Sequence, residues 1–443
     1  MTISPNIVMI NEDVNLNHTD KIVIGGNSTL VTLPINNDMI VVGSVDDPGQ
    51  LDLRLNGEYH KQGEVTLVNP RSEIKIKSAF EGENKITFAE ISMVESSEVS
   101  DADGFGVVSV DSGNGGIFID AEAFGRDSRR LALFKINGNS NVLTTADIFS
   151  KKIVLNTISS NPMSVTTGNL NTGGDGVIIF NDDIDLESSG IVTDTIDLKG
   201  TASSITFNSP AIIQVDQITD GHNTELRFND SGVIKPLNDN FYGHYRLGNI
   251  CVGDLLRVEK GLYQASFILD HDSNKLVLSD VSLQGGIKKA SGVTKSSVSL
   301  LTSTVIDGAV GELHSKIDEV SIGDQIDDQE IVVETTKLYS DRVSLNGHVS
   351  LVVDNMLDVG RITSSRGSSS ILIKDKGEIR GEVEAFGQFV LGPNAEMTLS
   401  SNDFKANIVV TESKKGRLFV NNAILTNNLG KIGSVDFNLA DVS

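Results

Sequence analysis

The sequence has no tryptophan, one cysteine and only 8 prolines among 443 residues. The single cysteine, Cys251, excludes an intrachain disulfide and therefore a disulfide-rich scaffold. A reactive thiol needs a basic partner close by, and His244 is seven positions away, so we interpret Cys251 as a small buried residue. Scarce cysteine is compatible with a cytosolic protein and equally with a protein that crosses a bacterial periplasm.

Positive charge is also scarce, since 36 lysines and arginines face 60 aspartates and glutamates, for a formal net charge of -24. An acidic surface repels phosphate, so we expect no nucleic-acid partner. The densest basic cluster, Arg126, Arg129 and Arg130, encloses Asp127, and we interpret it as a solvated face rather than a docking patch.

Long hydrophobic runs are absent as well. No stretch approaches the roughly 18 consecutive apolar residues of a membrane-spanning helix. Residues 1–10 lack the basic and apolar regions of a signal peptide. We therefore expect no direct membrane insertion and no export signal in this sequence.

Short strand-like segments fill the chain. Hydrophobic residues make up 39% of it, enough for a large core, and glycine occurs 42 times. The segments alternate apolar and polar residues and are separated by glycine, asparagine and proline, which favour tight turns. Examples are residues 21–24, 39–42, 63–68, 72–76 and 84–88. Because no helical stripe appears between Gly176 and Asn229, we predict an all-β fold rather than alternating strands and helices.

A Phe-Asn pair recurs at the ends of predicted strands, as Phe180-Asn181, Phe207-Asn208, Phe228-Asn229 and Phe437-Asn438. The first three phenylalanines are 27 and then 21 residues apart. Recurrence at this period is typical of a solenoid, in which each turn must stack on its neighbours to bury its apolar face. We expect roughly 22 residues per turn, hence about twenty turns, with these three rings pointing inward in one ladder.

Composition suggests a division of the chain. We predict a solenoid with an N-terminal cap over residues 1–235, an irregular or loop-rich excursion over 236–284, and a continued solenoid over 305–443. The middle range holds three of the five tyrosines and the cysteine, and glycine, lysine, serine and threonine dominate 285–304. A single uninterrupted solenoid is the alternative.

Paired carboxylates are the main catalytic possibility, because β-helical polysaccharide hydrolases and lyases use carboxylates on adjacent turns. Asp182-Asp183 is such a pair, but Asn181-Asp182-Asp183 is also a turn sequence, which we favour in a chain with 60 acids. Gly221-His222-Asn223 lacks the second glycine of the β-helical galacturonase motif.

Protease and metal motifs are weaker. Asp111-Ser112-Gly113 matches part of a chymotrypsin-like nucleophile loop, yet Val110 stands where that family has glycine, so we predict a turn. Residues 113–120 and 173–177 partly match calcium-binding nonapeptide turns, which need tandem copies that this chain lacks. Zinc-type Cys/His spacing is absent. We predict no catalytic residue, no cofactor and no metal.

The Phe-Asn strand endings and the segments 196–210 and 431–438 resemble the passenger domains of rickettsial surface cell antigens, most clearly over 168–237 and 417–443. Those proteins are autotransporters. The resemblance implies a right-handed parallel β-helix, exposure on a bacterial cell surface or secretion, and an outer-membrane translocator barrel as export partner. We expect a passenger without its own translocator.

Together the pattern and the resemblance predict a non-enzymatic surface scaffold, an adhesin that binds a protein or glycan of a host or neighbouring cell. The alternative is a β-helical polysaccharide hydrolase or lyase. These functions differ in one structural feature, which is whether carboxylates on adjacent turns converge with a basic residue in one groove.

Overall fold

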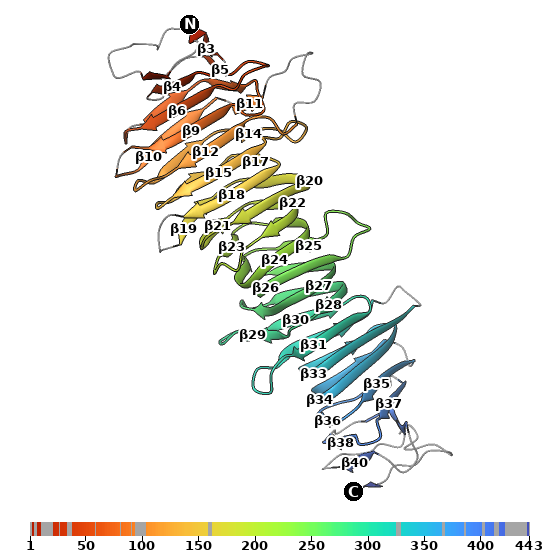
Figure 1. Cartoon of the computed structure of the whole chain (residues 1–443). Coiled ribbons are helices and arrows are strands. Elements are labelled where there is room, and N and C mark those ends of the chain that lie inside the picture. Colours follow the sequence, from red (N-terminus) through yellow and green to blue (C-terminus); the bar gives the residue numbers. More distant parts are fainter. Residues whose placement is uncertain are drawn as a thin grey trace. The chain divides into compact units, whose positions relative to one another are not determined.

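Parallel strands form all the regular structure that the computed structural model describes (Figure 1). The described residues are 2–3, 7–9, 21–25, 27–32, 38–57, 59–79, 81–89, 91–93, 103–157, 162–324, 329–365, 368–384, 387–400, 404–411, 416–420 and 441–442. The strands stack into a β-solenoid of about 17 turns, which confirms the predicted fold class. Within these residues no helix is long and apolar enough to cross a membrane.

The chain divides into two compact units, residues 1–226 with 237–241 and residues 227–236 with 242–443. Strands of the first unit are β1 (Thr2–Ile3), β2 (Ile7–Met9), β3 (Lys21–Ile24), β4 (Thr29–Thr32), β5 (Met39–Val42), β6 (Gln50–Leu55), β7 (Tyr59–Gln62), β8 (Glu64–Leu67), β9 (Glu73–Ser78), β10 (Asn84–Phe88), β11 (Ile91–Met93), β12 (Val107–Asp111), β13 (Ile117–Asp120), β14 (Ala123–Phe124), β15 (Leu133–Gly138), β16 (Val142–Thr144), β17 (Asp147–Phe149), β18 (Lys152–Thr157), β19 (Met163–Thr166), β20 (Asn169–Phe180), β21 (Ile184–Glu187), β22 (Gly190–Asp197), β23 (Ser204–Phe207) and most of β24 (Ala211–Phe228).

Strands of the second unit are β25 (Gly232–Lys235), β26 (Gly243–Val252), β27 (Leu255–Leu269), β28 (Asn274–Leu283), β29 (Ile287–Lys289), β30 (Ser296–Leu300), β31 (Thr304–Val310), β32 (Ile317–Ile322), β33 (Glu330–Leu345), β34 (His348–Ser364), β35 (Ser369–Ile373), β36 (Lys376–Ile379), β37 (Gly387–Leu391), β38 (Glu396–Leu399), β39 (Asn407–Val410), β40 (Arg417–Val420) and β41 (Asp441–Val442).

Turn length varies along the chain. Glu73 of β9 pairs with Val107 of β12, whereas Gln388 of β37 pairs with Asn407 of β39 across a much shorter stretch of chain. Both pairings are parallel, because insertions at the corners lengthen a turn without disturbing the strands that stack. The expected average of roughly 22 residues per turn is therefore too short, and the solenoid has about 17 turns instead of about twenty.

The core consists of columns of inward side chains that repeat from turn to turn. Alternate residues of each strand point inward, and parallel pairing places equivalent positions directly above one another. One such column, with every member at most 1% exposed, is Leu53, Ile76, Val110, Ile136, Leu155 and Phe180. Burial of each side chain contributes about 1.5 to 3 kcal/mol, so stacking supplies the stability of a turn.

The Phe-Asn motif is correctly predicted to face inward, since Phe180, Phe207 and Phe228 are all buried. The prediction that the three rings stack in one ladder is wrong for Phe180 and Phe207, which lie in different columns. Ile179 of β20 pairs with Asp197, which precedes Phe207 in the chain, and Phe207 ends β23, the strand that pairs with β21. The spacing between the first two copies therefore moves the motif to a different column. Phe437-Asn438 lies outside the described residues.

The asparagine of the motif has its own role at a corner. The Asn156 side-chain amide donates to the Asn137 side-chain oxygen at 2.5 Å, and Asn181 donates in the same way to Asn156 at 2.5 Å. A stacked coil favours such ladders, because each amide is both donor and acceptor and repeats at every turn.

Strands run through most of the range 236–284, for which the sequence predicted an irregular excursion. Tyr245 of β26 pairs with Tyr263 of β27, and their buried rings stack with centroids 4.3 Å apart. Burial, followed by the proximity of Tyr245, raises the pKa of Tyr263 well above its ordinary value. Tyr245 and Tyr263 thus belong to a regular aromatic stack in the core of the second unit, whereas Tyr242 is exposed.

Replacing Phe180 by alanine is expected to destabilise the first unit by about 3 to 5 kcal/mol, because it leaves a cavity in a closed column. Hydrogen exchange of the amides in β18, β20 and β22 measures the loss locally. The matched control is Ile212→Ala, since Ile212 is 52% exposed and its truncation is expected to cost under about 0.5 kcal/mol. Equal losses in the two variants would contradict the assigned column.

Candidate functional site

The Asp182-Asp183 pair contacts backbone amides of two other turns. The Thr157 amide donates to Asp182 Oδ2 at 3.1 Å, and the Ala202 amide donates to Asp183 Oδ1 at 2.8 Å. The two carboxylates therefore join the preceding and following turns at a corner, which agrees with the turn role favoured from the sequence.

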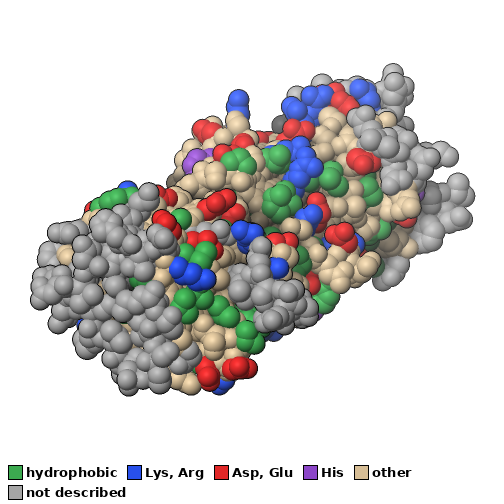
Figure 2. Space-filling view, turned by 90° about the horizontal axis from the view of Figure 1, so that it is seen from above, with side chains coloured by type: hydrophobic (Ala, Val, Ile, Leu, Met, Phe, Trp, Pro, Cys, Tyr) green, Lys and Arg blue, Asp and Glu red, His purple; other side chains and the backbone are tan. Residues whose placement is uncertain are grey.

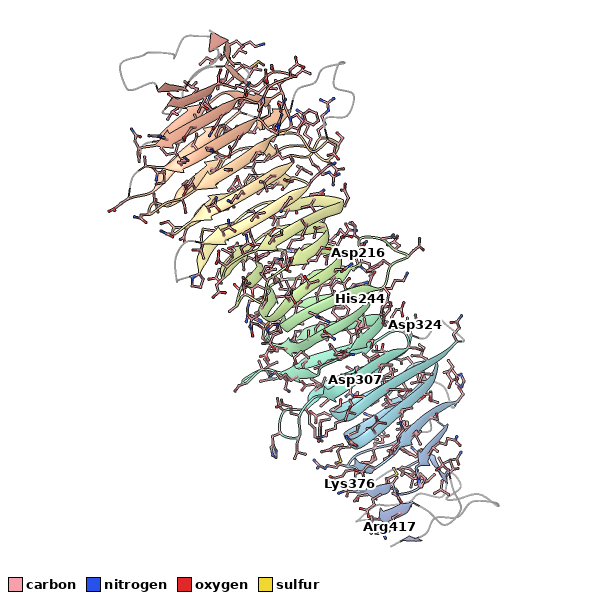
Figure 3. The ribbon with its side chains drawn as sticks, viewed as in Figure 1. Asp216, His244, Asp307, Asp324, Lys376 and Arg417 are labelled. Carbon is pink, nitrogen blue, oxygen red and sulfur yellow. The ribbon has the colours of Figure 1, made fainter. Side chains whose placement is uncertain are left out.

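Other aspartates repeat this contact, in which a carboxylate accepts an amide of another turn. The acceptors and donors are Asp147 with Asn169, Asp216 with Leu237 and Asn238, Asp272 with Thr294, and Asp318 with Ser296. Figure 3 labels Asp216, which is buried in β24. Hydrogen bonds from the Thr294 amide and hydroxyl lower the pKa of Asp272. A share of the acidic excess thus serves the backbone.

Ser112 also has a structural role. Its side chain is buried, and its hydroxyl donates to the Ser140 carbonyl at 2.8 Å. The Gly113 amide donates to Asp111 Oδ1 at 3.1 Å, which closes a turn. These contacts match the turn predicted for Asp111-Ser112-Gly113.

Arg130 lies at the centre of an ion-pair cluster in the first unit. Its guanidinium contacts the carboxylates of Asp103 and Asp175, each at 2.7 Å, and donates to the Thr172 carbonyl. Lys151 Nζ lies 3.2 Å from Asp103. Burial raises the pKa of Asp103, but hydrogen bonds from Arg130 and Lys151 outweigh it and lower the value to about 2. The same carboxylate raises the pKa of Arg130.

The prediction that the basic cluster forms a solvated face is thus wrong for Arg130. Arg126 is exposed, as expected. Asp103 and Asp175 are distant in the sequence and approach only through stacking. Gly173, in the stretch compared with calcium turns, has a φ of +69°, and an added Cβ would lie 2.1 Å from Arg130 Nη1. Glycine there makes room for the guanidinium. Among the described residues no three His, Cys, Asp or Glu side chains are placed to hold a metal ion.

Each unit contains a tight turn that ends in a half-buried cation. In the first, Arg126 and Arg129 form an isolated antiparallel bridge just before Arg130. In the second, Glu312 and Ser315 form the equivalent bridge before Lys316. The glycines that begin these turns, at 125 and 311, have φ of +75° and +77°.

Lys316 binds a fully buried acid. Its Nζ lies 2.6 Å from Asp358 Oδ1, and the Arg380 guanidinium lies 3.3 Å from Asp358 Oδ2, an ion-pair contact without hydrogen-bond alignment. The sequence analysis missed this arrangement. Its local signal is a glycine followed five residues later by lysine or arginine, which is too common to predict a site.

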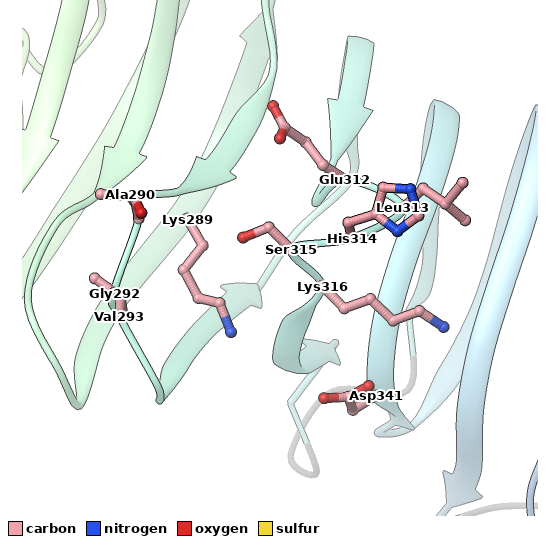
Figure 4. A pocket seen from close by; sticks show the side chains of 11 residues that line it. Lys289, Ala290, Gly292, Val293, Glu312, Leu313, His314, Ser315, Lys316 and Asp341 are labelled. Carbon is pink, nitrogen blue, oxygen red and sulfur yellow. The ribbon is translucent and has the colours of Figure 1, made fainter.

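The turn of the second unit borders a cleft of about 620 Å³ (Figure 4). It is lined by Lys289, Ala290, Ser291, Gly292, Val293, Glu312, Leu313, His314, Ser315, Lys316 and Asp341. Lys289 is paired with Asp318 at 3.2 Å, and Lys316 with Asp358. Figure 4 shows the carboxylates of Glu312 and Asp341 directed away from each other. The cleft contains acids and bases but does not bring two carboxylates together.

A hollow of about 410 Å³, hereafter the outer groove, lies on the outward face of β10, β13, β16 and β19 in the first unit. It is lined by Glu83, Asn84, Lys85, Gly116, Ile117, Phe118, Asn141, Val142, Leu143, Ser164 and Thr166. Strand pairing aligns Lys85, Phe118, Leu143 and Thr166 in one outward column, with Tyr59 of β7 next to Lys85.

Large side chains in this column are open to solvent. Tyr59 is 59% and Leu143 39% exposed, and Lys85 Nζ lies 5.3 Å from the Tyr59 ring centroid and 4.7 Å from that of Phe118. Uneven turn lengths hide the column from the sequence, because its members have no constant spacing. Elsewhere acidic and basic side chains are interspersed, as on the face in Figure 2.

Asp103→Asn is expected to destabilise the first unit by about 1 to 2 kcal/mol at pH 7, after allowance for solvent screening. The folded-state pKa of Asp103 is lowered, so its contribution is complete above the ordinary value of about 4 and is lost as the pH falls towards about 2. Urea unfolding followed by circular dichroism at pH 7, 4 and 2 measures this. The exposed Asp46→Asn is the control, and a penalty independent of pH would contradict the ion-pair assignment.

Lys316→Met is expected to destabilise the second unit by about 3 kcal/mol, because the variant removes the nearer cation from a buried carboxylate. Lys288→Met removes an exposed lysine from the adjacent β29 and is expected to change stability by less than about 0.5 kcal/mol. Thermal unfolding of both variants is the measurement. If Lys316→Met left the stability unchanged, Arg380 alone would be sufficient to neutralise Asp358.

Comparisons of this chain with protein-family models, with curated proteins and with solved structures find no match. The structure shows a parallel β-solenoid, and no family is assigned to the chain.

Proposed function

We propose that this chain is a non-enzymatic binding scaffold displayed on a bacterial cell surface or secreted, an adhesin of the autotransporter-passenger type. Its partner is a protein or glycan of a host or neighbouring cell. The observation that carries the proposal is the outer groove, where Leu143 is 39% exposed and Phe118 is half-buried, with Tyr59, 59% exposed, directly beside it. Exposed apolar side chains that gather in one place are typical of binding sites.

The architecture suits display. Each turn repeats the same outward positions about 4.8 Å from the last, so a stacked coil presents ordered columns of side chains on a rigid base. Core stacking supplies the stability of each turn, which leaves the outward residues available for recognition. The resemblance to rickettsial passengers supports a location at the cell surface.

The alternative, a polysaccharide hydrolase or lyase, has less support. Such enzymes need two carboxylates near one sugar linkage. Asp182 and Asp183 accept backbone amides of different turns, and Glu312 and Asp341 diverge across their cleft. Asp182 and Asp183, the pair considered as catalytic from the sequence, therefore have structural contacts.

Beads coated with the purified chain are expected to adhere to cultured mammalian epithelial cells, and free chain is expected to compete for the same sites. Beads coated with heat-unfolded chain are the matched control, because they carry the same charge without ordered columns. Adhesion no greater than that control would contradict the proposal. Release of reducing ends from added polysaccharide would instead favour the enzymatic alternative.

A further inference from the structure

The outer groove permits a more specific inference about the ligand, which rests on the proposed binding function. We propose that it binds a neutral, unbranched glycan chain that lies across β10, β13, β16 and β19. The groove crosses four stacked strands, so its ends are about 14 Å apart. This length matches an extended ligand that contacts one position in each turn.

One side of the groove is an apolar column. The Tyr59 hydroxyl is hydrogen-bonded to the Thr87 hydroxyl at 2.9 Å, which fixes the ring across two strands. Tyr59 lies beside the groove lining, Lys85 follows it in the column, and Phe118 and Leu143 continue the column on the next two turns. Sugar rings have an apolar C–H face, which packs on aromatic and aliphatic side chains of this kind.

The other side is a polar column. The polar column consists of the residues that lie two positions earlier in each strand pairing than the apolar column. They are Glu83, Gly116, Asn141 and Ser164. Glu83 and Asn141 are exposed, and together with Ser164 they offer both donors and acceptors, which hydroxyl groups require. Gly116 lacks a side chain, so a hollow separates Glu83 from Asn141.

Charge favours a neutral chain over a sulfated or phosphorylated one. The groove lining contains one acid, Glu83, and one base, Lys85, so it carries no net charge. The whole chain has a formal net charge of -24 and repels polyanions at a distance. A polycationic ligand would meet Lys85 between the two aromatic rings.

The geometry favours a glycan over a protein partner. An extended peptide binds by pairing with a free sheet edge, but the backbone groups under this groove already pair with neighbouring turns. A protein interface needs about 800 Å² on each side. The hollow of 410 Å³ instead falls in the range of small-ligand pockets, about 300 to 1,000 Å³.

The test is calorimetric titration of the full chain with hexaoses built from glucose, N-acetylglucosamine, mannose or galactose, and with a heparin hexasaccharide. At least one neutral hexaose is expected to bind, more tightly than its disaccharide, and heparin is not. Gly116→Val is expected to weaken that binding at least tenfold. A Cβ at Gly116 would lie 3.6 Å from the nearest atom, the Asn141 carbonyl oxygen, which is an ordinary contact distance, and the valine methyl groups add bulk to the hollow.

Phe118→Thr is expected to weaken binding similarly, and Ile212→Thr, which removes an exposed apolar side chain outside the groove, is the matched control. The inference is overturned if no neutral hexaose binds, if heparin binds more tightly, or if Gly116→Val leaves the affinity unchanged. It is equally overturned if Gly116→Val abolishes capture of a protein partner and no glycan binds. Bead adhesion that persists in Gly116→Val without glycan binding would remove this inference alone and leave the proposed function standing.

Discussion

The parallel hydrogen-bond ladder between successive turns is the interaction on which the rest of this structure depends. It places equivalent residues above one another, so a side chain's surroundings are set by its column as much as by its neighbours in sequence. Inward columns such as Ile136, Leu155 and Phe180 bury apolar surface, and corner columns such as Asn137, Asn156 and Asn181 exchange amide hydrogen bonds. Insertions of different length are tolerated at corners, because the ladder constrains only the strands.

The same stacking gives a structural role to some of the acidic residues. Aspartates at corners accept amides of other turns, as Asp183 does from Ala202. The few cations are correspondingly valuable, and Arg130 and Lys316 each neutralise carboxylates inside their own unit. Buried charge is costly unless it is paired, so these cations secure tight turns that would otherwise leave acids unpaired.

A scaffold of this kind separates stability from recognition. Inward columns and corners hold the turns together, and outward columns face solvent. The outer groove combines open apolar side chains, a flanking polar column and a glycine that leaves a hollow between Glu83 and Asn141. Fold alone does not imply function, and the proposal of glycan binding depends on these particular residues.

Sequence alone determined the fold class, because alternating apolar residues and turn formers report directly on local backbone conformation. It also favoured turns at Asp182-Asp183 and Asp111-Ser112-Gly113 and predicted the inward direction of Phe180, Phe207 and Phe228, since these features depend on a few consecutive residues. Only the tertiary structure decided the columns. The length of chain between paired strands differs widely from turn to turn, so neither the partners of Arg130 nor the alignment of Tyr59 with Phe118 follows from spacing. Those contacts depend on register, which the ladder sets between segments that share no local sequence signal.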